Sequence, residues 1–363
     1  MRKWKMTNDA RVHAAMRLAL AFFISAAPLA SASAQQLVPI KIASQTPPIF
    51  EYVYINYAIA GGFLKKEGLD AKFVGFTSGL TTTQALAGGS VDAACDGFTG
   101  TVAAIAKGSP AKVVYAVNSD NTYVVVSRDT ITKPADLPGK KWAITQMGAI
   151  SQTYAALWLS KNGLPDGTVD WIPIGGTSAR ARAVIANQVD VTLLTVGEWV
   201  RIREQKGVRL LATISDTVPP LPLNLCAVSA KLINEHPDVV QKLVNGILNA
   251  VREARTPEGR KQYIKIAREI DPTGYTDKQY DELYNYYFGE KGNPLAVDPN
   301  GGLYPEIYVS NMKSMVAAKG LNAALPLVTL WDPRFVNQYL GEHGWYDVTT
   351  RKGNLTLRDL LKH

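Results

Sequence analysis

Apolar and polar positions follow one pattern twice along the chain. The apolar run at residues 40–43 ends before Gln45 and a helical pattern, and the run at 142–145 ends before Gln146 and a second helical pattern. Each copy continues with a strand pattern, another helical pattern and a third strand pattern. Strands that alternate with helices predict a mostly parallel sheet covered by helices. We therefore expect an α/β fold built from two similar units.

The two copies agree most closely around the second helix of each unit. The first copy reads GFTSG at 75–79 and ALAGGSVD at 85–92, and the second reads GGTSA at 175–179 and AVIANQVD at 183–190. In open sheets of this kind, ligands bind beyond the carboxyl ends of the strands, where loops lead into helices. The repeat therefore predicts two lobes with two facing sets of loops.

From residue 237 onward the pattern becomes helical throughout. Apolar residues recur at three- and four-residue spacing over 237–254, 257–270, 277–288, 304–318 and 333–340. We expect these helices to cover the first lobe. No long Pro/Gly/Ser linker separates the lobes, so we expect the chain to cross at 123–127 and 219–225. This assigns residues 35–123 and 226–363 to the first lobe and 128–222 to the second.

The N-terminus has the pattern of a secretory signal peptide. Five basic residues precede an apolar run at 18–30, which ends at Ala32-Ser33-Ala34. This order predicts cleavage before Gln35. The alternative, a membrane anchor, is disfavoured because a run of about a dozen residues is too short to span a bilayer. Removing residues 1–34 lowers the formal charge from +8 to +4, so the mature chain is less basic than the full sequence.

The remaining composition argues against several functions. Lys and Arg are scattered without a basic tract, so we expect no nucleic-acid partner. The four histidines are residues 13, 236, 343 and 363, and none lies in either repeated unit. We therefore expect no Ser-His or Cys-His nucleophile on the loops. No Cys pair has zinc spacing, so we expect neither metal nor cofactor. Cys95 and Cys226 form either a disulfide or two buried free thiols, and the sequence leaves this open.

Candidate binding residues follow the strands of both units. Their hydroxyls, amides, rings and few charges suit hydrogen bonding to a small solute. In the first unit they are Gln45, Thr46, Thr77, Ser78, Asp96, Gly97 and Phe98, and in the second they are Gly148, Ser151, Thr177, Ser178, Arg180, Glu198 and Trp199. Each has a structural alternative, because Ser and Thr cap helices, rings fill cores and Arg180 could point to solvent.

Several short motifs occur in the order found in one family. GFLKKEGL at 62–69, ALAGGSVD at 85–92 and ADLPGKK at 135–141 together resemble the periplasmic substrate-binding proteins of ABC importers, of the nitrate, sulfonate and taurine type. Thiamine-precursor binders belong to the same superfamily. The resemblance implies a type II clamshell, exported to the periplasm as a monomer. Its lobes would close on one solute through the strand-end residues and then dock on an ABC permease in the inner membrane.

The resemblance leaves two solute classes open. Asp96 and Glu198 occupy corresponding loops and would repel a small anion, whereas thiamine-precursor binders use acidic and aromatic residues. Arg180 and the capped helix starts favour an organic anion, namely a sulfonate, taurine, nitrate or a carboxylate. The alternative is a thiamine-precursor pyrimidine or another nitrogen heterocycle.

The family resemblance also extends to some enzymes, including desulfinases, which need a nucleophilic cysteine in the cleft. Asp96 beside Cys95 would raise the pKa of that thiol, so we expect a binding protein and not an enzyme. A sensor module that presents its ligand to a membrane receptor stays open as a third class.

Overall fold

The computed structural model describes residues 36–46, 50–120, 122–214, 217–218, 220, 222–272, 274–289, 296–317 and 320–347. The predicted signal peptide, residues 1–34, lies outside these ranges. Within them, no helix combines the length and the apolar character that crossing a membrane requires. The following description concerns residues 37 onward, which form one compact unit.

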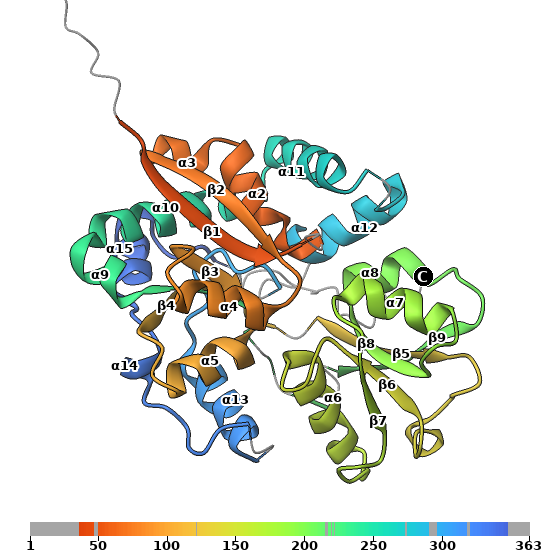
Figure 1. The fold of residues 1–363 in the computed structure, drawn as a ribbon. Helices are drawn as coiled ribbons and strands as arrows, with labels where there is room; N and C mark the ends of the chain where they lie inside the picture. Colours follow the sequence, from red (N-terminus) through yellow and green to blue (C-terminus); the bar gives the residue numbers. More distant parts are fainter. Residues whose placement is uncertain are drawn as a thin grey trace, which may run out of the picture. The chain divides into compact units, whose positions relative to one another are not determined.

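The first lobe is built on a five-stranded sheet in the order β2-β1-β3-β10-β4 (Figure 1). The strands are β1 (Val38–Gln45), β2 (Leu69–Phe76), β3 (Ala93–Asp96), β4 (Ala111–Asn118) and β10 (Asn224–Ser229). β1 runs parallel to β2 and β3, and β10 is antiparallel to both β3 and β4. The strand that returns late in the sequence, β10, is therefore an interior strand that lies between β3 and β4.

The second lobe repeats this arrangement in the order β7-β6-β8-β5-β9. The strands are β5 (Tyr123–Arg128), β6 (Lys141–Ile144), β7 (Asp170–Pro173), β8 (Val191–Thr195) and β9 (Val208–Thr213). Here β5 is the inserted strand, antiparallel to β8 and β9. The segment 123–127 was expected to be a β-rich crossing between the lobes. It is this strand, but it lies within the second sheet, with Val124 and Val126 in one core and Tyr123 and Val125 in the other.

Helices cover both faces of the first sheet. The elements are η1 (Phe50–Tyr52), α2 (Val53–Ala60), α3 (Phe63–Lys66), α4 (Gly79–Ala87), α5 (Phe98–Ala106), α9 (Ala230–Glu235), α10 (Pro237–Glu253), α11 (Pro257–Ile270), α12 (Asp277–Phe288), α13 (Pro305–Ala317), α14 (Leu327–Leu330) and α15 (Arg334–His343). Ile42 faces a core shared with α2, α10 and α11, whereas Ala43 faces one shared with α5, α13 and α14. Adjacent strand residues point to opposite faces, which is why both are buried.

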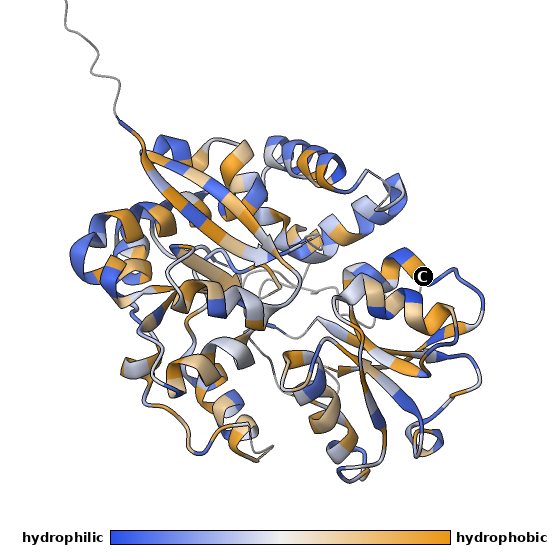
Figure 2. Cartoon of the chain, in the orientation of Figure 1, coloured by the Kyte–Doolittle hydropathy of each residue, from blue (hydrophilic) through white to orange (hydrophobic). Residues whose placement is uncertain are grey.

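The second sheet is covered in the same way by η2 (Pro134–Asp136), α6 (Ile150–Lys161), α7 (Thr177–Ile185) and α8 (Val196–Ile202). Trp142 of β6 packs against Trp158 of α6 with ring centroids 6.0 Å apart, and Ala143 faces the core that contains Val184 of α7. Figure 2 shows hydrophobic residues along the strands, while helices such as α9 and α11 carry many hydrophilic ones.

Asp92 and Asp190, which end the two copies of the repeated motif, each accept a hydrogen bond from the backbone of an equivalent strand. The Asp92 carboxylate accepts a 2.7 Å hydrogen bond from the backbone N–H of Lys41, and Asp190 accepts one of 2.9 Å from the N–H of Lys141. Lys41 lies in the middle of β1 and Lys141 at the start of β6, and both lie away from the strand ends that carry the candidate site. The repeat therefore preserves a structural contact at this position.

Candidate functional site

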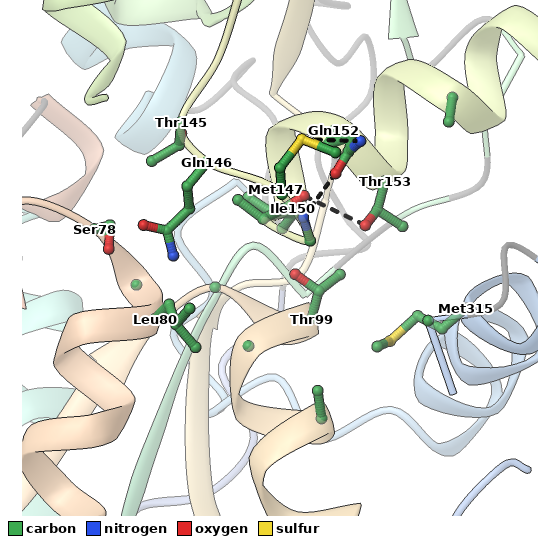
Figure 3. Close-up of a pocket in the computed structure, with 18 of the residues that line it drawn as sticks. Ser78, Leu80, Thr99, Thr145, Gln146, Met147, Ile150, Gln152, Thr153 and Met315 are labelled. Carbon is green, nitrogen blue, oxygen red and sulfur yellow. Dashed lines mark hydrogen bonds between the residues drawn. The ribbon is translucent and has the colours of Figure 1, made fainter. Parts of the chain in front are cut away.

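A pocket lies where the strand-end loops of the two lobes meet. Its volume is about 630 Å³, within the range of sites for organic ligands. Figure 3 shows α4 and α5 of the first lobe on one side and α6 with its preceding loop on the other. The predicted residues that line it are Gln45, Ser78, Asp96, Gly97 and Gly148. The pocket therefore joins loops that are distant in the sequence.

Three helices begin at the pocket wall. Ser78, Gly97 and Ala149 are the N-cap residues of α4, α5 and α6, and all three line the pocket. The Ser78 hydroxyl accepts a 3.3 Å hydrogen bond from the N–H of Thr81, as predicted for a helix cap. The first N–H groups of a helix lack intrahelical acceptors. This wall can therefore donate hydrogen bonds to a polar group of a solute.

The loop before α6 supplies the facing wall. Gly148 has φ +76°, a left-handed conformation that favours glycine, and its N–H donates a 2.7 Å hydrogen bond to Gln152. This turn leaves Met147 of the second lobe 59% exposed, and Leu80 of the first lobe is 40% exposed. Both line the pocket, and Figure 3 shows the Gln146 side chain directed toward Ser78 and Leu80. Apolar contacts of this kind suit an organic solute better than a bare inorganic ion.

Asp96 is the buried acid of the pocket. Its Oδ1 accepts hydrogen bonds from the Gly97 N–H at 2.6 Å and from the Gln45 side chain at 3.1 Å. Its Oδ2 is also buried. Burial raises the pKa of Asp96 to about 6, and hydrogen bonds from the Gly97 N–H, the Thr82 hydroxyl and the Gln45 side chain limit the rise. Asp96 is therefore a buried hydrogen-bond acceptor at the pocket, and its partners are neutral donors.

The approach of α4 to Asp96 explains one difference between the repeats. The first copy has Gly79 where the second has Ala179, and a Cβ at Gly79 would lie 2.5 Å from Asp96 Oδ1. We expect Gly79→Ala to displace this carboxylate, to cost about 1–3 kcal/mol of stability and to weaken solute binding at least tenfold. The measurement is calorimetric titration with a solute identified as described below. Gly176→Ala is the control, since its nearest atom would lie at 4.0 Å; equal affinities of the two variants would contradict the prediction.

Arg180, the predicted anion contact, is enclosed within the second lobe at 1% exposure. It donates five hydrogen bonds, to Thr145 Oγ1 (2.7 Å), Gly175 O (2.7 Å), Thr177 Oγ1 (3.2 Å), Thr192 Oγ1 (3.2 Å) and Leu193 O (3.0 Å). A guanidinium has five N–H donors, so each has an acceptor in the protein. The anion contact expected from the sequence therefore has no free donor at Arg180.

Glu198 and Ser178 contact each other in the second lobe. The Ser178 hydroxyl donates a 2.9 Å hydrogen bond to Glu198 Oε2, which also lies 3.9 Å from Arg201. The Thr195 hydroxyl caps α8 and accepts a bond from the Glu198 N–H at 3.5 Å. Neither Ser178 nor Glu198 lines the pocket.

The other predicted residues also lie outside the pocket lining. Phe98 packs in the first lobe with its ring centroid 5.6 Å from that of Tyr308, and Trp199 is a buried core residue. The Ser151 hydroxyl accepts a 2.9 Å bond from the Thr145 N–H, which fixes the end of β6. Thr46 and Thr77 are exposed, and Thr177 accepts one of the Arg180 bonds.

Glu51 is a chemically distinctive residue that the sequence analysis missed. It is 1% exposed, and no Lys or Arg of the described residues forms an ion pair with its carboxylate. Burial raises its pKa to about 7; the hydroxyls of Tyr287 and Thr195 limit the rise, and the charge of Glu198 adds to it. Glu51 stands between Phe50 and Tyr52 in an aromatic run, and the local sequence does not show that its carboxylate is buried.

The two cysteines are joined. Cys95 of β3 and Cys226 of β10 face each other in the sheet register and form a disulfide. Both are fully buried. The only cysteine that could have served as a nucleophile is therefore oxidised and enclosed beside Asp96. Among the described residues, no group of three or more His, Cys, Asp or Glu side chains could hold a metal ion.

Solved structures share this fold. The alkanesulfonate-binding protein SsuA from Xanthomonas axonopodis pv. citri, bound to MOPS, aligns with a TM-score of 0.67 at 19% identity, over 82% of this chain and 99% of that one. The periplasmic nitrate-binding protein NrtA from Synechocystis PCC 6803 gives 0.67 at 14%, over 85% and 89%. A DszB mutant in complex with biphenyl-2-sulfinic acid gives 0.56 at 14%, over 84% and 99%.

These likenesses establish the two-lobed periplasmic-binding-protein fold, with its helical C-terminal extension. Among curated proteins, none matches this sequence. The family model described as NMT1/THI5 like matches residues 50–259, which is more than half of the chain and includes strands from both lobes. The protein belongs to the NMT1/THI5-like family.

Proposed function

We propose that this protein is the solute-binding receptor of an ABC importer. It would capture a small organic solute in the periplasm and deliver it to a membrane permease. The observation that carries the proposal is the pocket formed jointly by strand-end loops and helix starts of both lobes. A ligand that contacts both walls stabilises the state in which they approach each other, which is how a hinged receptor couples binding to closure.

For the solute, the geometry supports a nitrogen heterocycle or another molecule with N–H donors. Asp96 is a buried carboxylate that lines the pocket and forms no ion pair with a described Lys or Arg, while the donors of Arg180 are all engaged. Hydrogen bonds to a charged acceptor are stronger than those between neutral groups, so a solute that donates to Asp96 gains affinity. The second candidate, an organic anion, is supported by the three helix starts in the wall.

The disulfide supports binding over catalysis. The desulfinase-like reaction would require a thiolate at Cys95, and the sulfur there is bonded to Cys226. No His lies among the pocket residues that could act as a general base. We therefore propose no enzymatic activity for this site.

The test is thermal denaturation of the mature protein after refolding to remove carried-over solute. The panel compares solutes that donate hydrogen bonds, aminopyrimidines and benzamidine, with anions that accept them, benzoate, benzenesulfonate, taurine and nitrate. A ligand at about a hundred times its Kd adds about 2.7 kcal/mol, which raises the Tm by several degrees. We expect this shift with an N–H donor.

Two variants on α5 localise the effect. Ala103→Trp fills the pocket and should abolish the shift, whereas Ala104→Trp, on the same helix outside the pocket lining, should retain it. The absence of any shift across the panel would count against a receptor for these solute classes. A shift that survives Ala103→Trp would mean that the solute binds elsewhere.

A further inference from the structure

The pocket continues from Asp96 along one side of α5. The lining residues of this helix and its two ends are Gly97, Thr99, Gly100, Ala103 and Lys107. Their spacing places them on the same side of the helix. From Gly97 to Lys107 the helix rises about 15 Å, at about 1.5 Å per residue. In Figure 3, Ser78 and Met315 accordingly lie at opposite sides of the pocket.

Two further helices enclose the part of the pocket that lies away from Asp96. α6 of the second lobe contributes Thr153 and Ala156 to the lining, and β7 contributes Trp171. α13 of the first lobe contributes Met315, whose side chain extends from its helix toward the pocket (Figure 3). We call this part the outer compartment, and its lining residues are Thr99, Ala103, Thr153, Ala156, Trp171 and Met315.

Contacts within the protein hold the three helices together. The Tyr154 hydroxyl of α6 donates a 3.0 Å hydrogen bond to Asn311 Oδ1 of α13, and both residues are buried. The Asn311 side chain in turn donates a 2.9 Å bond to Pro220 O, between β9 and β10. Phe98 of α5 packs against Tyr308 of α13 with ring centroids 5.6 Å apart. These contacts fix the walls of the outer compartment independently of any solute.

The outer compartment has neutral walls made of methyl, thioether, indole and hydroxyl groups. Asp96 lies at the inner end of the pocket, and its other charged lining residues, Lys107 and Asp166, are exposed. Apolar surface is favourably buried in such surroundings, whereas an unpaired charge is costly to bury. A volume of about 630 Å³ also corresponds to a drug-sized ligand and exceeds what one polar group at Asp96 requires.

We propose that the outer compartment binds an uncharged, apolar extension of the solute, such as an alkyl chain or an aryl group, while the polar head lies at Asp96. The inference rests on the proposed receptor function and names the solute class, an elongated molecule with one polar end. Met315 comes from the first lobe and Ala156 and Trp171 from the second. The extension therefore contacts both lobes, as the polar head does.

The test compares each polar head with and without an extension. Benzamidine, benzoate and benzenesulfonate are titrated calorimetrically beside their 4-butyl derivatives. A buried methylene adds about fourfold to affinity, so we expect the butyl group to strengthen binding of the head at least tenfold. A 4-(3-carboxypropyl) derivative has a similar length and a charged end, and it should show no such gain because the walls are neutral.

Two methionines of α13 localise the gain. Met315 lines the pocket, whereas Met312, one turn earlier, is buried in the same core outside the lining. Met315→Ala should make the butyl gain at least threefold smaller and leave the affinity for the head alone unchanged. Met312→Ala should destabilise the protein as much and keep the butyl gain. This pair separates contact with the solute from damage to the core.

A second pair, on α6, narrows the compartment without opening a cavity. Ala156→Phe should remove the butyl gain, because Ala156 is half-buried in the pocket wall. Ser160→Phe, on an exposed position of the same helix outside the lining, should keep it.

Three results would overturn this inference. Heads that bind equally with and without the butyl group, or a butyl gain that Met315→Ala and Ala156→Phe leave intact, would reject the outer compartment and leave the receptor function standing. An equal gain from the carboxypropyl group would contradict the apolar character of the compartment. If no head binds, with or without its extension, both this inference and the receptor function are rejected for these solute classes.

Discussion

Replacing both cysteines with alanine should lower the free energy of unfolding by about 2–5 kcal/mol. The Cys95–Cys226 disulfide closes a loop with a sequence separation of 131 residues, and the entropy lost by the unfolded chain grows with loop length. The bond joins β3, which ends at Asp96, to β10, which begins beside the crossing between the lobes. We expect the Tm to fall by roughly 5–15 °C.

A reductant distinguishes loss of the bond from loss of packing. Treatment of the wild type with a strong reductant under unfolding conditions should lower its transition to that of the double variant, and the variant should not respond. Guanidinium denaturation with and without reductant measures both. Equal stability of the oxidised wild type and the variant would contradict the prediction and would mean that the sulfurs contribute only as buried apolar groups.

Arg180→Met should destabilise the second lobe by about 3–5 kcal/mol, since removing one member of a buried polar network leaves its partners unpaired. The acceptors left without donors come from Thr145, directly after β6, from the loop before α7, from α7 and from β8, so Arg180 connects the elements that position the second wall. The measurement is urea denaturation, followed by solute titration of the folded variant.

Arg182→Met is the matched control, because Arg182 lies on the same helix and is exposed. It should change stability by less than about 0.5 kcal/mol. If Arg180 instead contacts the solute, Arg180→Met would bind it more than tenfold more weakly while unfolding at nearly the wild-type urea concentration. That result would contradict the structural role and restore the organic anion as the leading solute.

The repeated pattern predicted the alternation of strands and helices because this alternation is visible in short stretches of the sequence. Strand, helix and strand recur within each copy, and the caps and turns that join them have short signatures such as TSG at 77–79. The central antiparallel strands could not be obtained in this way. β10 pairs with β3, which is far away in the sequence, and β5 was predicted to connect the lobes. The spacing of apolar residues within a strand does not reveal which other strand it pairs with.

The candidate site was predicted in outline only. Ser78, Asp96 and Gly148 belong to loops whose place at the strand ends follows from the fold, and the pocket includes them. Whether a polar side chain has free donors depends on partners that the sequence does not reveal. Arg180 was predicted to contact an anion, but all its donors are engaged within the protein, and Glu51, which the sequence analysis did not single out, is a fully buried acid.

The most direct measurement is a crystal structure of the protein with the panel solute that raises its Tm most. The account predicts that the solute lies between Asp96 and the loop at 146–149, in contact with both lobes, with an N–H group directed to a carboxylate oxygen. A solute that contacts one lobe alone, or that binds outside the pocket, would contradict the proposal that this protein is a receptor closing on its cargo.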